Sequence, residues 1–169
     1  MVSAVPASGT FSGEASAGAA SPATAGGGRT RHRLGIAVLD MDAMAGFYER
    51  LGLSMVVGHP EWAAHHRSVS GDDAPDIELD SVAFTSWWNE GWGGNSGVVL
   101  GFEVPDRPAV DRLYDELTAA GATPQQAPYD AFWGARFAVV ADPGGNAIAV
   151  TSPLDPAHRS APPPPPGSQ

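Results

Sequence analysis

Aromatic side chains are the residues of this sequence best suited to bind a small organic molecule. The chain contains five tryptophans. Two of them, Trp92 and Trp133, lie in glycine-rich segments, which are expected to be loops, so these two are less easily packed in a core. Aromatic rings offer flat surfaces for stacking and for contacts with cations. We therefore expect a ligand-binding role for one set of aromatic residues: Trp62, Trp87, Trp88, Trp92, Tyr129, Phe132 and Trp133. For the tryptophans, packing in the core or at a subunit interface is the alternative.

Two polar side chains are candidates to orient such a ligand. Arg136 follows the last aromatic cluster, and a guanidinium can hold a carboxylate or phosphate through two hydrogen bonds. An ion pair between Arg136 and Asp130 is the alternative. His65 is the second candidate, because imidazole titrates near neutral pH. No residue is assigned a catalytic role, but acid–base chemistry in an enzyme would fall to carboxylates: Glu78, Asp80, Glu90 or Asp130.

The last aromatic cluster lies directly before a predicted β-hairpin. Asp142-Pro-Gly-Gly-Asn146 is a dense turn signal, because the proline restricts its own φ while glycine and asparagine tolerate positive φ. Residues 137–140 and 148–150, on either side, have the composition of β-strands. A hairpin with aromatic residues at its approach is expected to form one wall of a concave site.

The two halves of the chain repeat one pattern. In each half a strand-like run leads to an aspartate, Asp40 or Asp106, which is predicted to cap an amphipathic helix that ends before Gly52 or Gly121. Five identical pairs are separated by 66 positions: Val38/Val104, Asp40/Asp106, Ala43/Ala109, Tyr48/Tyr114 and Leu51/Leu117. A shared register of this kind indicates a duplicated unit.

Each half is predicted to be a strand, a helix and three further strands. In the first half we expect these three strands within residues 53–57, 62–69 and 77–87. A helix that covers one face of a sheet leaves the opposite face free for a ligand. The sequence thus predicts an α+β fold of paired βαβββ modules that form an open cup.

The ends of the chain are predicted to lie outside this fold. Residues 1–30 are rich in Ala, Gly and Ser without a basic start or an apolar core, which indicates a disordered tail and not a secretion signal. Residues 155–169 include five consecutive prolines and are expected to be a disordered Pro-rich tail. A single domain of residues 31–154 remains, with modules at about 33–88 and 97–153.

Charge and composition exclude several classes of function. The formal net charge is −10, with 9 basic residues, all arginine, against 19 acidic ones. Nucleic-acid binding requires a cationic surface, so it is not expected. No apolar run approaches the length of a membrane span, and the chain has no cysteine for disulfide or thiol chemistry. We expect a cytoplasmic protein without a nucleic-acid or membrane partner.

Several short motifs together resemble the vicinal oxygen chelate superfamily, which includes glyoxalase I, extradiol dioxygenases and bleomycin-resistance proteins. The matching segments cover most of residues 33–153: Ile36–Asp40, Phe47–Gly52, Phe102–Asp106, Ala119–Gly121, Phe132–Gly134 and Asp142–Asn146. This resemblance implies two βαβββ modules in one domain. Many single-domain members form homodimers, so a homodimer is also expected.

The resemblance implies positions for a metal site that this sequence does not fill with ligands. By register, the positions used by metal-binding members fall on Arg33, Val99, Ala149 and Glu78. Arginine stays protonated, and valine and alanine have no side-chain donor atom. Glu78 can be a ligand, but one carboxylate does not hold a metal such as zinc. A replacement site from His59, His65 and His66 is disfavoured, because neighbouring residues of a strand point to opposite faces. We therefore predict no metal and no cofactor.

Three functions remain open, and one is favoured. The favoured hypothesis is a metal-free homodimer that encloses a bulky, partly aromatic small molecule, with sequestration of a toxic natural product as its role. The alternative is an enzyme of the same superfamily, such as a lyase, isomerase or dioxygenase acting on a small organic substrate. The third is an accessory module whose proline-rich segment, residues 155–169, is recognised by a partner.

Overall fold

The computed structural model describes residues 31–69 and 75–167; the predicted tail of residues 1–30 lies outside this part. The first half contains β1 (His32–Val38), α1 (Met41–Arg50), β2 (Met55–Val56), the 3₁₀ turn η1 (Pro60–Trp62), β3 (His66–Val69), β4 (Ile77–Ser81) and α2 (Val82–Trp88). The second half contains β5 (Gly97–Glu103), α3 (Arg107–Ala119), β6 (Thr123–Asp130), β7 (Arg136–Ala141) and β8 (Ala147–Thr151), followed by the 3₁₀ turn η2 (Pro156–His158).

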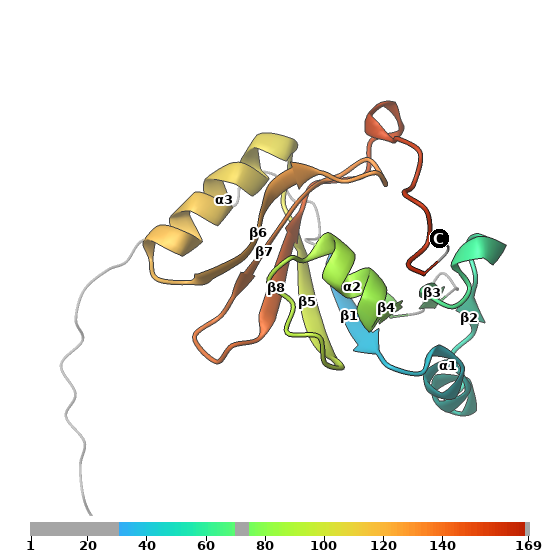
Figure 1. Ribbon diagram of the computed structural model, residues 1–169. Helices are drawn as coiled ribbons and strands as arrows, with labels where there is room; N and C mark the ends of the chain where they lie inside the picture. Colours follow the sequence, from blue (N-terminus) through green and yellow to red (C-terminus); the bar gives the residue numbers. More distant parts are fainter. Residues whose placement is uncertain (1–30, 70–74, 168–169) are drawn as a thin grey trace, which may run out of the picture.

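The strands form one mixed sheet in the order β2-β3-β4-β1-β5-β8-β7-β6. The two halves are built alike, since the first strand of each pairs in parallel with the last, β1 with β4 and β5 with β8. The halves are joined by the antiparallel pair β1 and β5. The sheet is not closed, and Figure 1 shows the two halves side by side with α1 and α3 at opposite ends. The predicted α+β fold of paired modules is confirmed.

Matching signals begin and end the helices that follow the first strand of each half. The Asp40 carboxylate accepts a hydrogen bond from the Ala43 amide at 2.9 Å, and Asp106 accepts one from Ala109 at 2.8 Å. Each helix is followed by a glycine with positive φ, +90° at Gly52 and +101° at Gly121. Within the described part of the chain, no helix combines the length and apolar character required to cross a membrane.

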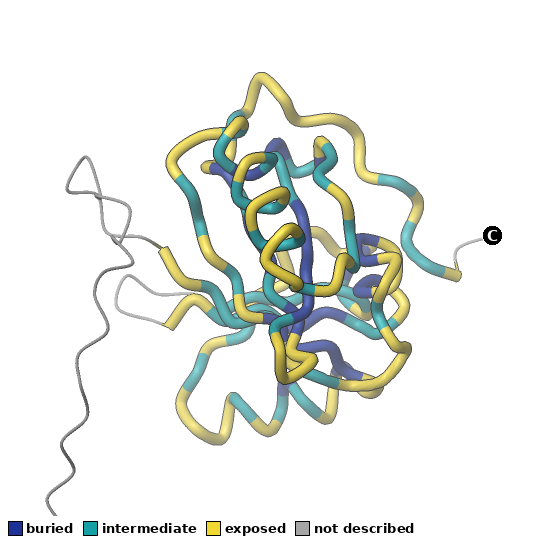
Figure 2. Tube along the Cα trace, turned by 90° about the vertical axis from the view of Figure 1, so that its left-hand side faces the viewer, coloured by how far each residue is buried: buried dark blue, intermediate teal, exposed yellow. Residues whose placement is uncertain are grey.

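The outer face of the sheet is covered at its two flanks. Under α1, the buried residues belong to the helix and to strands β1 and β4: Ile36, Val38, Met41, Ala45 and Leu79. Under α3, the buried cluster is Val110, Ala138 and Val150. Figure 2 shows buried residues through the middle of the molecule, with exposed residues around them. The inner face, opposite these helices, has a separate cluster rich in aromatic residues.

Two segments of the first half differ from the expected strands. The predicted strand of residues 77–87 ends at Ser81 and continues as α2, because the Ser81 hydroxyl accepts a hydrogen bond from the Phe84 amide at 3.1 Å and caps a helix. Phe84 and Trp88 are four residues apart and so lie on one face of that helix. The predicted strand of residues 62–69 is extended only from His66, because Pro60 begins a 3₁₀ turn that includes Trp62.

The segment after β8, which we call the C-terminal strap (residues 154–167), returns across the molecule. Its residues from 155 onward were expected to be a disordered tail, and the structure describes them as far as Gly167. The Asp155 amide donates to the Gly134 carbonyl at 3.1 Å, and the Ser160 amide donates to the Phe132 carbonyl at 3.0 Å. Figure 1 shows the strap running from the second half of the sheet towards β2 and η1.

Candidate functional site

A cavity of about 500 Å³ lies between the inner face of the sheet and α2. Strand alternation decides which residues form its floor. Two positions on each of the four central strands face the cavity: Glu78 and Asp80 on β4, Arg33 and Gly35 on β1, Val99 and Gly101 on β5, Ala149 and Thr151 on β8. The small residues in this set leave room above the middle of the sheet.

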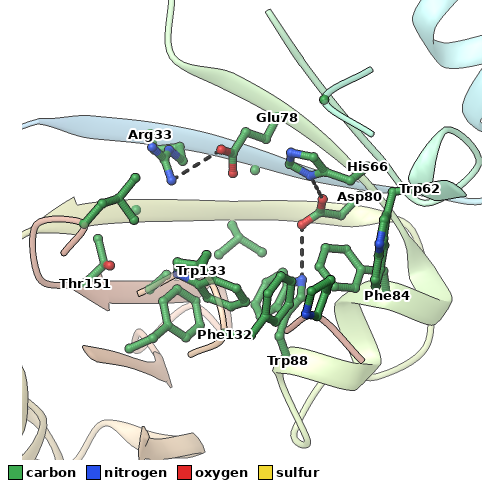
Figure 3. A pocket seen from close by; sticks show the side chains of 18 of the residues that line it. Arg33, Trp62, His66, Glu78, Asp80, Phe84, Trp88, Phe132, Trp133 and Thr151 are labelled. Carbon is green, nitrogen blue, oxygen red and sulfur yellow. Dashed lines mark hydrogen bonds and ion pairs between the residues drawn. The ribbon is translucent and has the colours of Figure 1, made fainter. Parts of the chain in front are cut away.

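Aromatic rings form one wall of the cavity (Figure 3). The ring of Trp62 lies 4.9 Å from that of Phe84 and is stacked at 6.1 Å against Phe132, centroid to centroid. Phe132 in turn contacts Trp133, with centroids 5.0 Å apart. Trp88 and Phe137 complete this wall. Rings from η1, α2 and the β6–β7 connection therefore face one space.

A hydrogen-bonded group of three side chains lies at the polar end of the cavity. Nδ1 of His66 is 2.7 Å from Oδ1 of Asp80, and Nε1 of Trp88 donates to Oδ2 of Asp80 at 3.1 Å. Burial alone would lower the pKa of His66, but the hydrogen bond to Asp80 and the charges of Asp80 and Glu78 outweigh it, so the pKa is raised. His66 is thus held as a side chain that carries a proton more readily than free imidazole does.

An arginine–glutamate pair lies next to this group (Figure 3). Nη1 of Arg33 is 3.3 Å from Oε1 of Glu78, and Nε of Arg33 donates to Asp76 at 3.1 Å. Burial raises the pKa of the Glu78 carboxyl, and Arg33 opposes this shift only in part. Burial thus disfavours the ionised form of Glu78. A ligand group that is cationic or donates a hydrogen bond would stabilise the ionised carboxylate.

Four of the predicted ligand-binding residues line the cavity: Trp62, Trp88, Phe132 and Trp133. Trp87 and Tyr129 do not line it; they pack behind it, Trp87 against Phe132 at 5.7 Å and Tyr129 against Trp133 at 6.4 Å between ring centroids. Trp87 and Trp88 are consecutive residues of α2 and point in different directions from the helix, and Trp88 is the one that lines the cavity.

The other three predicted residues also lie outside the cavity wall. Nε1 of Trp92 donates to the Asn95 carbonyl at 2.9 Å, and the ring packs against Gly97. His65 does not line the cavity; its ring lies 6.2 Å from that of Trp62, and its Nδ1 lies 2.9 Å from the Ser81 hydroxyl.

Arg136 binds carboxylates of the chain itself: Nη2 lies 2.6 Å from Asp111, and Nη1 lies 2.9 Å from Asp130. The alternative weighed for Arg136, an ion pair with Asp130, is the arrangement found.

His66, expected from the sequence only as a disfavoured metal ligand, is a residue of the cavity. It lies in the cavity because β3 and β4 pair with His66 opposite Asp80. Asp80 and Glu78 were candidate acid–base residues, and both line the cavity, whereas Glu90 and Asp130 do not. Strand alternation in the sequence predicts that His65 and His66 point to opposite faces, but it does not tell which face is the inner one. In the structure His65 lies in the turn before β3 and only His66 belongs to the strand.

The residues present do not fit the metal that the fold is associated with. The four register positions expected for metal ligands do face the cavity, but Arg33 is a cation, and Val99 and Ala149 have no donor atom. Within residues 31–69 and 75–167, no group of three or more His, Cys, Asp or Glu side chains is placed to hold a metal ion.

Comparison with known proteins agrees with the fold. The family described as the Glyoxalase/Bleomycin resistance protein/Dioxygenase superfamily matches residues 30–150. No curated protein matches the chain at a significant level.

Solved structures share the fold at low sequence identity. An NAD-dependent benzaldehyde dehydrogenase from Legionella pneumophila has a TM-score of 0.54 and 15% identity, over 74% of this chain and 100% of that one. A superfamily member from Vibrio splendidus has a TM-score of 0.50 and 15% identity, over 73% and 99%. A Mn(II)-bound glyoxalase from Novosphingobium aromaticivorans has a TM-score of 0.51 and 21% identity; the match covers 71% of this chain and only 37% of that one.

Proposed function

This chain belongs to the Glyoxalase/Bleomycin resistance protein/Dioxygenase superfamily, and within it we propose a metal-free protein that binds a bulky, partly aromatic small molecule. The observation that carries this proposal is the cavity itself: aromatic rings form one wall of a space of about 500 Å³, while three of the four expected metal positions, Arg33, Val99 and Ala149, hold residues that cannot coordinate. Pockets of this size, mostly apolar with a few polar groups, are typical small-molecule sites.

The two ends of the cavity suggest how the ligand would be held. The aromatic wall would supply affinity through burial of apolar surface, at about 25 cal/mol per Å², and through ring stacking. The polar end, with Glu78 and the His66–Asp80 pair, would orient a hydrogen-donating or cationic group of the ligand. Sequestration of a toxic compound in the cytoplasm, by a homodimer, is the biological role that we propose for such binding.

Fluorescence and calorimetry test this proposal directly. A panel of aromatic antibiotics, together with the neutral dye Nile red, should quench tryptophan emission and bind at one site per chain. Trp133→Leu should weaken binding, because Trp133 lines the cavity, and Trp92→Leu should not, because Trp92 packs outside it. Binding of no compound in the panel, or equal loss in both variants, would contradict the proposal.

One observation favours an enzyme as the second candidate. His66 has its Nδ1 bonded to Asp80, which leaves Nε2 as the nitrogen for acid–base work, and Trp88 fixes Asp80 from the other side. In a metal-independent isomerase or lyase, His66 would move the proton and Asp80 would be a positioning residue. If a substrate is found, His66→Gln should abolish turnover and His65→Gln should leave it unchanged; turnover that survives His66→Gln would exclude this role.

A further inference from the structure

We propose that the C-terminal strap is a movable cover of the ligand cavity, so that ligand enters and leaves only when the strap lifts. This inference rests on the proposed binding function and adds to it a segment that controls ligand entry and release. The strap lies beyond residues 30–150, the part of the chain that matches the family, yet Leu154 and Pro162 line the cavity. A segment outside the shared domain thus completes the site of this chain.

The strap crosses the cavity from one half of the fold to the other. It begins after β8 in the second half, and Pro162 shares the cavity wall with His59 and Glu61, which flank the start of η1 in the first half. Figure 1 shows this path, and Figure 2 shows that residues of the strap are exposed or only partly buried. A bridging, partly exposed segment can move without disturbing the sheet or its cores.

Two backbone hydrogen bonds attach the strap to the turn between β6 and β7. One runs from the Asp155 amide to the Gly134 carbonyl, and the other runs from the Ser160 amide to the Phe132 carbonyl. Gly134 fits Asp155 closely: its φ is +96°, and a Cβ there would lie 2.5 Å from the Asp155 carbonyl oxygen. Because the side chain of Phe132 forms part of the aromatic wall, the strap is attached to a residue that a ligand would touch.

The proline run explains why this cover can open and close at small cost. Pro162 to Pro166 have no amide N–H, so this part of the strap cannot donate backbone hydrogen bonds to the domain. Consecutive prolines are also stiff, so the strap loses little conformational freedom when it closes. The attachments at Asp155 and Ser160, together with contacts in the cavity, therefore contribute to closure.

The test removes one attachment and keeps everything else. Ser160→Pro deletes the amide that bonds Phe132, and the preceding residue accepts a proline because Arg159 has φ −71° and ψ 139°. Ser160→Ala is the matched control, since it retains that amide. Stopped-flow fluorescence with Nile red measures the association and dissociation rates of full-length wild-type protein and both variants.

The expected result is that both rates rise about fivefold in Ser160→Pro, the effect of losing one backbone hydrogen bond, while affinity changes little and Ser160→Ala matches wild type. Gly134→Ala, which pushes Asp155 away, should act in the same direction. Equal rates in Ser160→Pro and Ser160→Ala would overturn the inference, and so would a rise in dissociation alone, which would make the strap a fixed wall. Failure of wild-type protein to bind Nile red or any panel compound would overturn the proposed function, and this inference with it.

Discussion

Nδ1 of His66 lies 2.7 Å from Oδ1 of Asp80, across the paired strands β3 and β4 and inside the cavity. The same carboxylate accepts the indole N–H of Trp88. Asp80 thus connects His66 on β3 with Trp88 on α2 through hydrogen bonds. The polar and aromatic parts of the site therefore depend on each other. Changes to any of the three side chains should affect both stability and binding.

The His66–Asp80 pair should make stability depend on pH. Because the pKa of His66 is raised in the folded protein, the stabilisation is fully present below the unfolded value of about 6.5 and is lost as pH rises through the folded value. His66→Gln should therefore lower the free energy of unfolding by about 1 kcal/mol at pH 5.5, and less at pH 8.5. Urea denaturation at both pH values measures this.

The control for that experiment is His65→Gln, since His65 does not line the cavity and its Nδ1 bonds the Ser81 hydroxyl. This variant removes an imidazole whose described hydrogen-bond partner is a hydroxyl and not a carboxylate. The charged groups around His66 are Asp80 and Glu78 on β4 and Arg33 on β1. A loss in His66→Gln that is the same at both pH values would show that its proton does not contribute.

The two adjacent tryptophans of α2 should respond differently to the same substitution. Trp88→Phe keeps a ring in place but removes the donor to the buried Asp80, so it should lower the free energy of unfolding by about 2 kcal/mol. Trp87→Phe removes no described hydrogen bond from a side chain that is 43% exposed, and it should have little effect. Equal losses in the two variants would contradict the role assigned to the Trp88 indole.

Metal ligands can be introduced at the expected metal positions, to test whether these four positions converge as they do in metal-binding members of the superfamily. Arg33, Val99 and Ala149 face the cavity together with Glu78. A combined variant with Arg33→His, Val99→His and Ala149→Glu would bring two imidazoles and two carboxylates to this place, a donor set suitable for Zn²⁺ or Mn²⁺. Calorimetry should show binding of one ion per chain, and adding Glu78→Gln should weaken it. No gain of metal binding would mean that the four positions do not converge.

Arg136 should contribute to stability and not to ligand affinity. Its guanidinium bonds Asp111 on α3 and Asp130 at the end of β6, outside the cavity. Arg136→Gln should lower the free energy of unfolding by about 1 kcal/mol, since both ion pairs are partly exposed to solvent. Its affinity for Nile red should equal that of wild type. A selective loss of affinity would restore Arg136 as a ligand-binding residue.

An uncovered apolar stripe on β5 allows a test of the predicted homodimer. Val98, Leu100 and Phe102 lie on the outer face between the parts covered by α1 and α3, with exposures of 37–47%, and Leu100 pairs with Leu34 and Ile148. If two chains meet here, Leu100→Glu should convert a dimer to a monomer in light scattering. Leu39→Glu, at a 79% exposed position in the β1–α1 connection, is the control. A monomeric wild-type protein would contradict the prediction.

The sequence by itself determined the helix caps and turns, because their hydrogen bonds join residues only a few positions apart. Asp40 and Asp106 cap helices through amides three positions away, and the Asp142 carboxylate accepts from the amides of Gly144 and Asn146 within its own turn. Such short-range geometry depends on local residue types alone. The duplicated modules were visible for the same reason, because both halves carry the same local signals.

Only the tertiary structure decided which members of the candidate set face the cavity. His65 and His66 are neighbours in the sequence, and so are Trp87 and Trp88, but no local pattern says which member of either pair faces inward. For the histidines, the pairing of His66 with Asp80 on β4 settles that choice, and it depends on contact between distant segments. For the tryptophans, the Ser81 cap that begins α2 is a local signal, but the packing of α2 over the sheet decides that Trp88 faces the cavity. The strap is the same case, since its attachments to Phe132 and Gly134 join parts of the chain that no local pattern relates.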